Sequence, residues 1–130
     1  MSEAKLSRTL VDALRRKGAV VHRVENAISS GLPDIYVAYK GRSFWVETKV
    51  VKKNCARPHF ERAQPVIINR LANEGVPVFV VVRNDEGEIW TFKAPLTIRD
   101  GEIEHSRVWI DNETSNVAFD LLNHVISDGV

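Results

Sequence analysis

The sequence predicts an α/β domain in which a mixed β-sheet is flanked by α-helices, and three observations lead to this fold class. Apolar residues with four-residue spacing open the chain and predict an amphipathic helix over residues 2–17. Two strands, 34–39 and 43–51, are separated by so short a turn that we expect an antiparallel hairpin. Residues 76–82 form a nearly continuous apolar run, typical of a strand that is buried on both faces and covered by layers above and below.

The first half of the chain supplies a helix, three strands and two loops. The opening helix places Leu6, Leu10 and Leu14 on one face, and Gly18 is positioned to end it. Residues 19–24 predict a strand, and residues 25–33, rich in Asn, Ser and Gly, predict a loop. The hairpin follows, with its turn at residues 40–42. Residues 52–59 then form a basic, irregular connection.

The second half begins with a predicted helix over residues 60–73, which Gly75 ends. Pro65 leaves two alternatives: it occupies the first turn of this helix, or it kinks a longer helix that begins near Pro58. Strands are predicted at 76–82 and 88–92, strand-like stretches at 96–98 and 107–110, and a final helix at 116–126. The resulting order, αβββαββ…α with no internal repeat, predicts one domain over residues 1–130.

Length and composition agree with an ordinary globular domain. The chain has 130 residues, of which 44% are hydrophobic and 27% charged, so we expect a real core. It contains no charged-then-apolar leader and no run of about 18 apolar residues, so we expect no membrane partner and a cytoplasmic location. The single cysteine, Cys55, has no second cysteine to pair with and is interpreted as a reduced thiol.

The formal net charge of +1 hides two oppositely biased regions. Residues 40–70 carry eight Lys or Arg against two acidic residues, a net +6, whereas residues 84–130 carry three against ten, a net −7. Such asymmetry favours one surface that meets a polyanion and another that faces solvent. The alternative is that helices and turns carry scattered solvated charges.

The residues that point to chemistry lie on the predicted hairpin. Gly31–Leu32–Pro33–Asp34 is followed, thirteen positions after the aspartate, by Glu47–Thr48–Lys49. Asp34 opens one strand and Glu47 lies late on its partner, so the pairing can bring both carboxylates to the same end. Period-two alternation then puts Glu47 and Lys49 on one face with Trp45, and Thr48 on the other face with Phe44, Val46 and Val50.

Two carboxylates and a backbone carbonyl, that of Thr48, are suitable oxygen ligands for Mg²⁺, which keeps several waters of its own. A metal there can acidify water and neutralise charge that develops on a phosphodiester. Lys49 could hold or deprotonate the attacking water, or stabilise the developing charge as an ammonium. The residues alone leave these roles open.

At these positions the sequence resembles the PD-(D/E)xK nuclease superfamily, with Pro33–Asp34 and Glu47–Thr48–Lys49 as its two core motifs. Within it, the chain is most similar to the virus-type replication-repair nucleases (VRR-NUC) and to archaeal-type Holliday junction resolvases. Further points of likeness are Gly31, the basic loop after the lysine, Gln64 at a helix start, and Gly75 before an apolar strand. The likeness covers residues 3–83. It implies a restriction-endonuclease-like fold with a core at about 3–92, and it does not explain an acidic C-terminal extension at about 93–130.

The resemblance implies roles for individual residues. Asp34 and Glu47 are expected to be metal ligands together with the Thr48 carbonyl, Lys49 is expected to be catalytic, and Gln64 to assist in the site or contact the nucleic-acid backbone. Many such nucleases also carry a glutamate on the first helix, for which Glu3 is the candidate. The expected cofactor is Mg²⁺, which Mn²⁺ can replace.

The resemblance also implies DNA as the substrate, with branched DNA such as four-way junctions favoured, and a homodimer, because symmetric cutting needs two active sites. The residues expected to contact phosphates are Lys52, Lys53, Arg57, His59 and Arg62. The alternative for this segment is a soluble loop.

Alternatives remain open at each position. Asp34 could serve only turn geometry, Glu47 and Lys49 could form a solvated pair on an exposed strand, and Gln64 and Glu3 could be ordinary first-turn helix residues. For the whole chain, the alternatives to a branch-selective endonuclease are a non-catalytic DNA-binding module of a replication or packaging machine, and the nuclease subunit of a restriction or mobile-element system.

Overall fold

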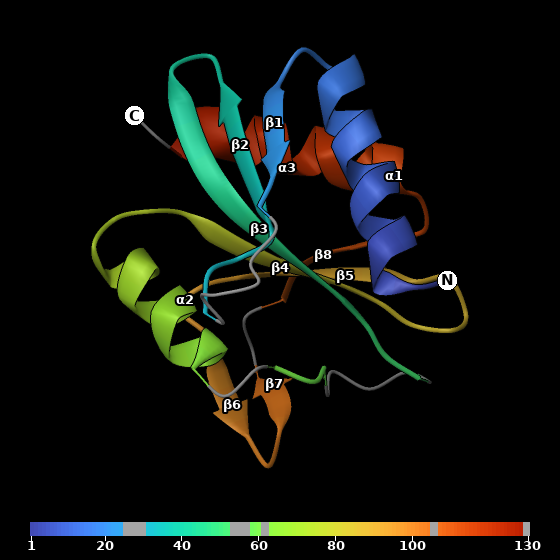
Figure 1. Ribbon diagram of the computed structural model, residues 1–130, viewed down its shortest axis with the longest axis vertical. Coiled ribbons are helices and arrows are strands. Elements are labelled where there is room, and N and C mark those ends of the chain that lie inside the picture. The colour runs from blue at the N-terminus through green and yellow to red at the C-terminus, as the bar shows by residue number, and fades with distance from the viewer. Residues whose placement is uncertain (25–30, 53–57, 61–62, 105–106, 129–130) are drawn as a thin grey trace.

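The computed structural model describes residues 1–24, 31–52, 58–60, 63–104 and 107–128. A six-stranded sheet of order β1-β2-β3-β4-β5-β8 forms its centre, and β6 and β7 form a separate two-stranded sheet (Figure 1). β3 and β4 are parallel, whereas the other neighbours in the large sheet are antiparallel, so the predicted mixed sheet flanked by helices is confirmed. The elements are α1 (Glu3–Arg16), β1 (Val20–Arg23), β2 (Ile35–Tyr39), β3 (Arg42–Val50), α2 (Gln64–Asn73), β4 (Val78–Arg83), β5 (Ile89–Lys93), β6 (Thr97–Arg99), β7 (Glu102–Glu104), β8 (Arg107–Asp111) and α3 (Thr114–Asp128).

The opening helix follows the predicted pattern. The Ser2 side chain caps α1 by accepting a hydrogen bond from the backbone N–H of Lys5 at 3.1 Å. Leu6, Leu10 and Leu14 are fully buried. After the helix the chain turns at Gly18, where φ is +96°, a conformation that glycine adopts without steric cost.

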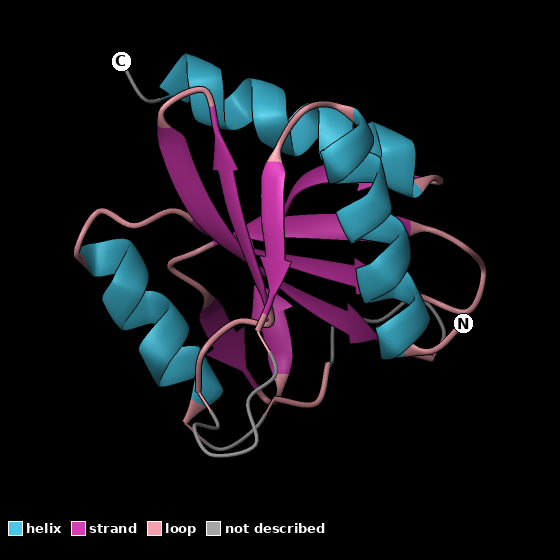
Figure 2. Cartoon of the chain, turned by 45° about the horizontal axis from the view of Figure 1, so that its top comes forward, coloured by secondary structure: helices cyan, strands magenta, loops and turns pink. Residues whose placement is uncertain are grey.

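Helices lie on both sides of the sheet (Figure 2), and an apolar layer covers each of its faces. On one face, α1 and α3 contact each other and pack with the inward residues of β1 to β5. On the other, α2 and the β6–β7 hairpin cover Val78, Val80, Val82 and Phe92. Alternate residues of β4 therefore enter different layers, and all five residues from Val78 to Val82 are buried, as the apolar run predicts.

The β2–β3 hairpin is confirmed as antiparallel, and its turn is tight. Tyr39 pairs with Arg42 across Lys40 and Gly41, whose φ values are +49° and +77°. Positive φ at both central residues is the geometry that matches the right-handed twist of the strands. This turn fixes the register, which ends with Ile35 opposite Val46.

The structure decides between the two alternatives for Pro65. The helix α2 begins at Gln64, so the proline occupies the first turn, where its missing N–H breaks no helical hydrogen bond. The predicted start at residue 60 was four residues too early. Gly75, with φ +86°, follows the end of the helix as expected.

The C-terminal third differs most from the sequence prediction. The segment after residue 92, expected to be an extension, supplies β8 at the edge of the main sheet and α3, whose Val117, Ala118 and Leu121 are fully buried. The strand at 107–110 and the helix at 116–126 were predicted, but their place in the core was not. The strand β7 was missed altogether, although Asp100–Gly101 between β6 and β7 is a strong hairpin signal. None of the described helices is long and apolar enough to cross a membrane.

Candidate active site

Asp34 and Glu47 meet where β2 begins. The register that pairs Ile35 with Val46 places Asp34 opposite Glu47, and the backbone N–H of Asp34 donates a hydrogen bond to Glu47 Oε1 at 3.1 Å. The Asp34 carboxylate accepts two hydrogen bonds from Thr48: the backbone N–H reaches Oδ1 at 3.2 Å, and the hydroxyl reaches Oδ2 at 2.9 Å. The aspartate thus replaces the strand partner that Thr48 lacks on this side, and its position is more than turn chemistry.

The same contact indicates the direction of the Thr48 carbonyl. In an extended strand the N–H and C=O of one residue point to the same edge, which is why paired residues can exchange both hydrogen bonds. Because the N–H of Thr48 points to Asp34, its carbonyl points to that edge too. Two carboxylates and one carbonyl oxygen are therefore available where β2 begins.

Lys49 lies beside Glu47, as the strand alternation predicts. Its Nζ is 3.3 Å from Glu47 Oε2, and both residues are buried, with exposed fractions of 6% and 5%. Nζ also lies 5.2 Å from the centre of the Phe60 ring. A solvated pair on an exposed strand does not describe this arrangement, because an ammonium and a carboxylate are both withdrawn from water.

Gln64 joins the group from the first position of α2. Its side chain hydrogen-bonds the Glu47 carboxylate, for which the amide nitrogen is the donor. The residue is 5% exposed, and its Oε1 has no hydrogen-bond partner among the described residues. The start of α2 and the start of β2 therefore both contact the Glu47 carboxylate of β3.

Burial opposes the charge of both acids. Desolvation, followed by repulsion from Asp34, raises the pKa of Glu47 to about 7, although Lys49 and Gln64 act in the opposite direction. Desolvation also raises the pKa of Asp34 above its ordinary value, against the hydrogen bonds from Thr48. A pair of close, desolvated carboxylates is an arrangement that a cation stabilises, because it replaces the lost hydration and removes the repulsion.

The donor set fits Mg²⁺, which commonly takes one or two carboxylates from a protein and fills its remaining positions with water and phosphate oxygens. The structure does not bring Glu3 into this set. Its side chain is exposed in the first turn of α1, and the described residues contain no group of three or more His, Cys, Asp and Glu side chains arranged for a metal. The carboxylates that the fold gathers are those of Asp34 and Glu47.

The predicted phosphate contacts are only partly described. Lys52 and His59 are exposed, and both lie in the connection between β3 and α2. Lys53, Arg57 and Arg62 lie outside the described residues, as does Cys55.

One residue of the site was not found from the sequence. Phe60, whose ring faces the Lys49 ammonium, lies in a segment predicted to be helix, where an aromatic residue is more often part of a core.

Gly31, which the resemblance singles out, lies against α2. A Cβ added there would overlap Cδ1 of Ile67, so the Ile67 side chain would have to move.

The six-stranded mixed sheet flanked by helices is similar to the fold of the Holliday junction resolvase Hjc. A solved structure with this fold is that of Archaeoglobus fulgidus Hjc, a Holliday junction resolvase from an archaeal hyperthermophile. The two align with a TM-score of 0.61 over 88% of this chain and 98% of that chain, at 16% sequence identity.

Likeness at that identity shows the fold. No family model matches the sequence, and no curated protein matches it either.

Proposed function

We propose that this protein is a metal-dependent endonuclease that hydrolyses phosphodiester bonds in DNA. The observation that carries the proposal is the meeting of the half-buried Asp34 carboxylate with the buried Glu47 carboxylate and the buried Lys49 ammonium, which lies 3.3 Å from Glu47. Burying three ionisable groups costs stability, and such clusters are concentrated at functional sites. The resolvase-like fold supports a nuclease over other uses of the same groups.

Asp34, Glu47 and the Thr48 carbonyl would hold the cation, with Mg²⁺ the expected ion and Mn²⁺ a substitute. When bound, the cation supplies Lewis acidity and neutralises charge on the phosphodiester. The chain's own residues position these ligands: Thr48 orients the Asp34 carboxylate through two hydrogen bonds, and the Asp34 N–H and Gln64 orient that of Glu47. Such orientation lowers the cost of bringing the reacting groups together.

Lys49 supplies positive charge next to the attacked phosphorus, and it stabilises the charge that builds on the phosphate oxygens. In hydrolysis, a water oxygen forms a bond to phosphorus, one P–O ester bond breaks, and the departing ester oxygen takes up a proton. Gln64 Oε1, buried and aimed at no described donor, is a suitable acceptor for the attacking water.

Branched DNA is the proposed substrate class, and a homodimer the proposed form. A domain of 130 residues has little surface for base readout, and cutting both strands of a junction symmetrically needs two sites. The basic residues Lys52, Lys53, Arg57, His59 and Arg62 are proposed phosphate contacts, since phosphate contacts position a duplex without reading its sequence. A monomeric mass by light scattering would contradict the dimer.

The test is cleavage of labelled linear, flap and four-way DNA with Mg²⁺ and with EDTA. We expect metal-dependent cutting of branched substrates and a loss of at least about 10³-fold for Asp34→Asn, Glu47→Gln and Lys49→Ala, in line with removal of groups that act on the transition state. Asp12→Asn and Lys5→Ala, which remove matching charges at exposed positions of α1, are the controls and should cut like wild type.

The outcomes separate the alternatives. If wild type cuts none of these substrates and Asp34→Asn binds DNA as well as wild type, the chain is a binding module. Cutting that depends on base sequence rather than on branch geometry indicates a restriction or mobile-element nuclease.

A further inference from the structure

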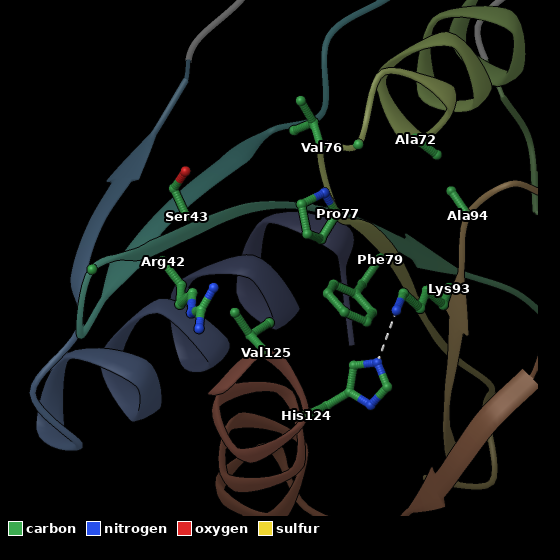
Figure 3. Close-up of a pocket in the computed structure, with 12 residues that line it drawn as sticks. Arg42, Ser43, Ala72, Val76, Pro77, Phe79, Lys93, Ala94, His124 and Val125 are labelled. Atoms are coloured by element: carbon green, nitrogen blue, oxygen red, sulfur yellow. Dashed lines mark hydrogen bonds between the residues drawn. The ribbon is translucent and has the colours of Figure 1, made fainter. Parts of the chain in front are cut away.

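A cavity of about 460 Å³ lies away from the carboxylates, at the end of the sheet where β3 and β4 begin (Figure 3). Its lining comes from the β2–β3 turn, the segment between α2 and β4, the end of β5 and the second half of α3. Glu47 is five residues further along β3 than Arg42, which at strand rise is about 17 Å. The volume lies in the range typical of small-molecule sites.

The cavity gathers basic side chains from three elements. Arg42 begins β3, Lys93 ends β5, and His124 lies on α3. The described residues that line the cavity include Ser43 but no Asp or Glu. In a chain with nearly equal numbers of acidic and basic residues, this lining selects for an anion.

The Lys93–His124 pair is fixed in place by the fold. Register places Lys93 beside Phe79 on the face that α3 covers, and its Nζ lies 3.0 Å from His124 Nε2. The imidazole packs edge-on against Phe79 at 5.8 Å and Trp109 at 5.3 Å between ring centres. Lysine loses much rotamer freedom when it binds, so an ammonium that is already held binds an anion at lower entropic cost.

Apolar side chains line the middle of the cavity. Figure 3 shows Arg42 on one side and the Lys93–His124 pair on the other, with Pro77, Phe79 and Val125 between them. A ligand that fills this space carries a negative group at one end and an apolar body beside it. Arginine also stacks on flat rings, a property that the Arg42 guanidinium offers at the far side.

We propose that this cavity is a second binding site, for a phosphate carried on a flat apolar body of mononucleotide size. The phosphate contacts Lys93 and His124, and the body lies between Pro77 and Arg42. A free nucleotide and the phosphorylated end of a nucleic-acid strand share this chemistry. The site uses none of the groups of the proposed nuclease centre, so binding there can be tested independently of cleavage.

The experiment follows backbone amide shifts of the ¹⁵N-labelled protein on titration with adenosine 5′-monophosphate, adenosine and inorganic phosphate. We expect saturable shifts at residues 41–43, 75–77, 93–94 and 124–125 with the nucleotide, and binding at least about tenfold weaker for adenosine or phosphate alone, since each makes half of the contacts. A parallel titration with short single strands, with and without a 5′-phosphate, identifies the source. A response that requires the phosphate supports a strand end, and a response to the nucleotide alone supports a free ligand.

Two variants test the assignment. Lys93→Gln should weaken nucleotide binding at least about tenfold, and Arg42→Glu, at an exposed position, should do so without disturbing the core. Lys5→Gln, on α1, is the matched control and should bind like wild type. The proposal is overturned if no ligand saturates by about 10 mM, if the shifts centre on Glu47 to Lys49, or if folded Lys93→Gln and Arg42→Glu both bind like wild type.

Discussion

Replacing Glu47 by glutamine should change how the stability of the metal-free protein depends on pH. Burial and the nearby Asp34 raise the pKa of Glu47 from 4.5 to about 7, so the folded state takes up a proton that the unfolded chain has already released in this range. The contribution of this group to the free energy of unfolding is therefore fully present below about pH 4.5 and is lost as the pH rises through about 7. At 1.36 kcal/mol for each pH unit, the loss is about 3 kcal/mol.

Glutamine keeps the size of the side chain and an oxygen acceptor for the Asp34 N–H, but it carries no charge. The free energy of unfolding of Glu47→Gln relative to wild type should therefore rise by up to about 3 kcal/mol between about pH 4.5 and about pH 8. Urea denaturation in EDTA at a series of pH values measures this difference. Asp12→Asn, at an exposed position, should show no comparable trend.

Mg²⁺ provides the second arm of the same experiment. A cation that binds only the folded state stabilises it in proportion to the logarithm of its concentration, so wild type at about pH 8 should recover stability that Glu47→Gln does not. If the difference between wild type and variant is flat with pH in EDTA, or if both respond equally to Mg²⁺, the electrostatic account of the site is wrong.

Three further changes follow from the structure. Burial and the neighbouring Asp120 raise the pKa of Asp111 to about 6, so wild type loses stability as the pH rises through 6. Asp111→Asn should raise the free energy of unfolding at about pH 8, measured by urea, by less than about 1 kcal/mol, because solvent screens this pair. The gain should vanish below about pH 4. An equal gain at every pH would contradict this assignment. Gly31→Ala should lower the free energy of unfolding by about 1–3 kcal/mol, measured by urea, because the added methyl overlaps the α2 side chain packed on it; an unchanged midpoint would refute the overlap. Phe60→Leu should lower kcat about tenfold at unchanged KM, because it removes the ring face next to the Lys49 ammonium. Phe60→Tyr, which keeps a ring, should cut at the wild-type rate. Equal rates for the two variants would show that the ring only fills space.

The sequence predicted best what depends on local pattern. Helical spacing located α1, and the short connection predicted the antiparallel hairpin, although its turn was placed at residues 40–42. The turn is Lys40–Gly41, with Tyr39 opposite Arg42, and this register brings Asp34 opposite Glu47. Strand alternation then placed Lys49 beside Glu47. These relations span at most 15 residues along the chain, so turn geometry and side-chain period determine them.

What failed depends on contacts between distant segments. Residues 93–130 were assigned to an extension because the resemblance does not explain them, whereas the place of α3 and β8 in the core follows from what α1 and the sheet leave uncovered. Phe60 over Lys49, and the Lys93–His124 pair across β5 and α3, each join segments whose approach no local pattern encodes. Glu3, a candidate ligand from the resemblance, is exposed in the first turn of α1, and no local pattern determines how far that turn lies from Asp34.

The fold explains why an arrangement that costs stability persists. β3 lies between β2 and β4, but β2 begins only at Ile35, so the backbone of β3 beyond Val46 would lack a partner on one side. The Asp34 carboxylate fills that gap through Thr48, which forces one acid into the sheet, and the register forces Glu47 beside it. A protein selected only for stability would place a neutral side chain such as asparagine at residue 34, since it can also accept from Thr48 without the desolvation penalty. The half-buried Asp34, the buried Glu47 and the buried Lys49 are therefore better explained by binding a ligand than by stabilising the fold.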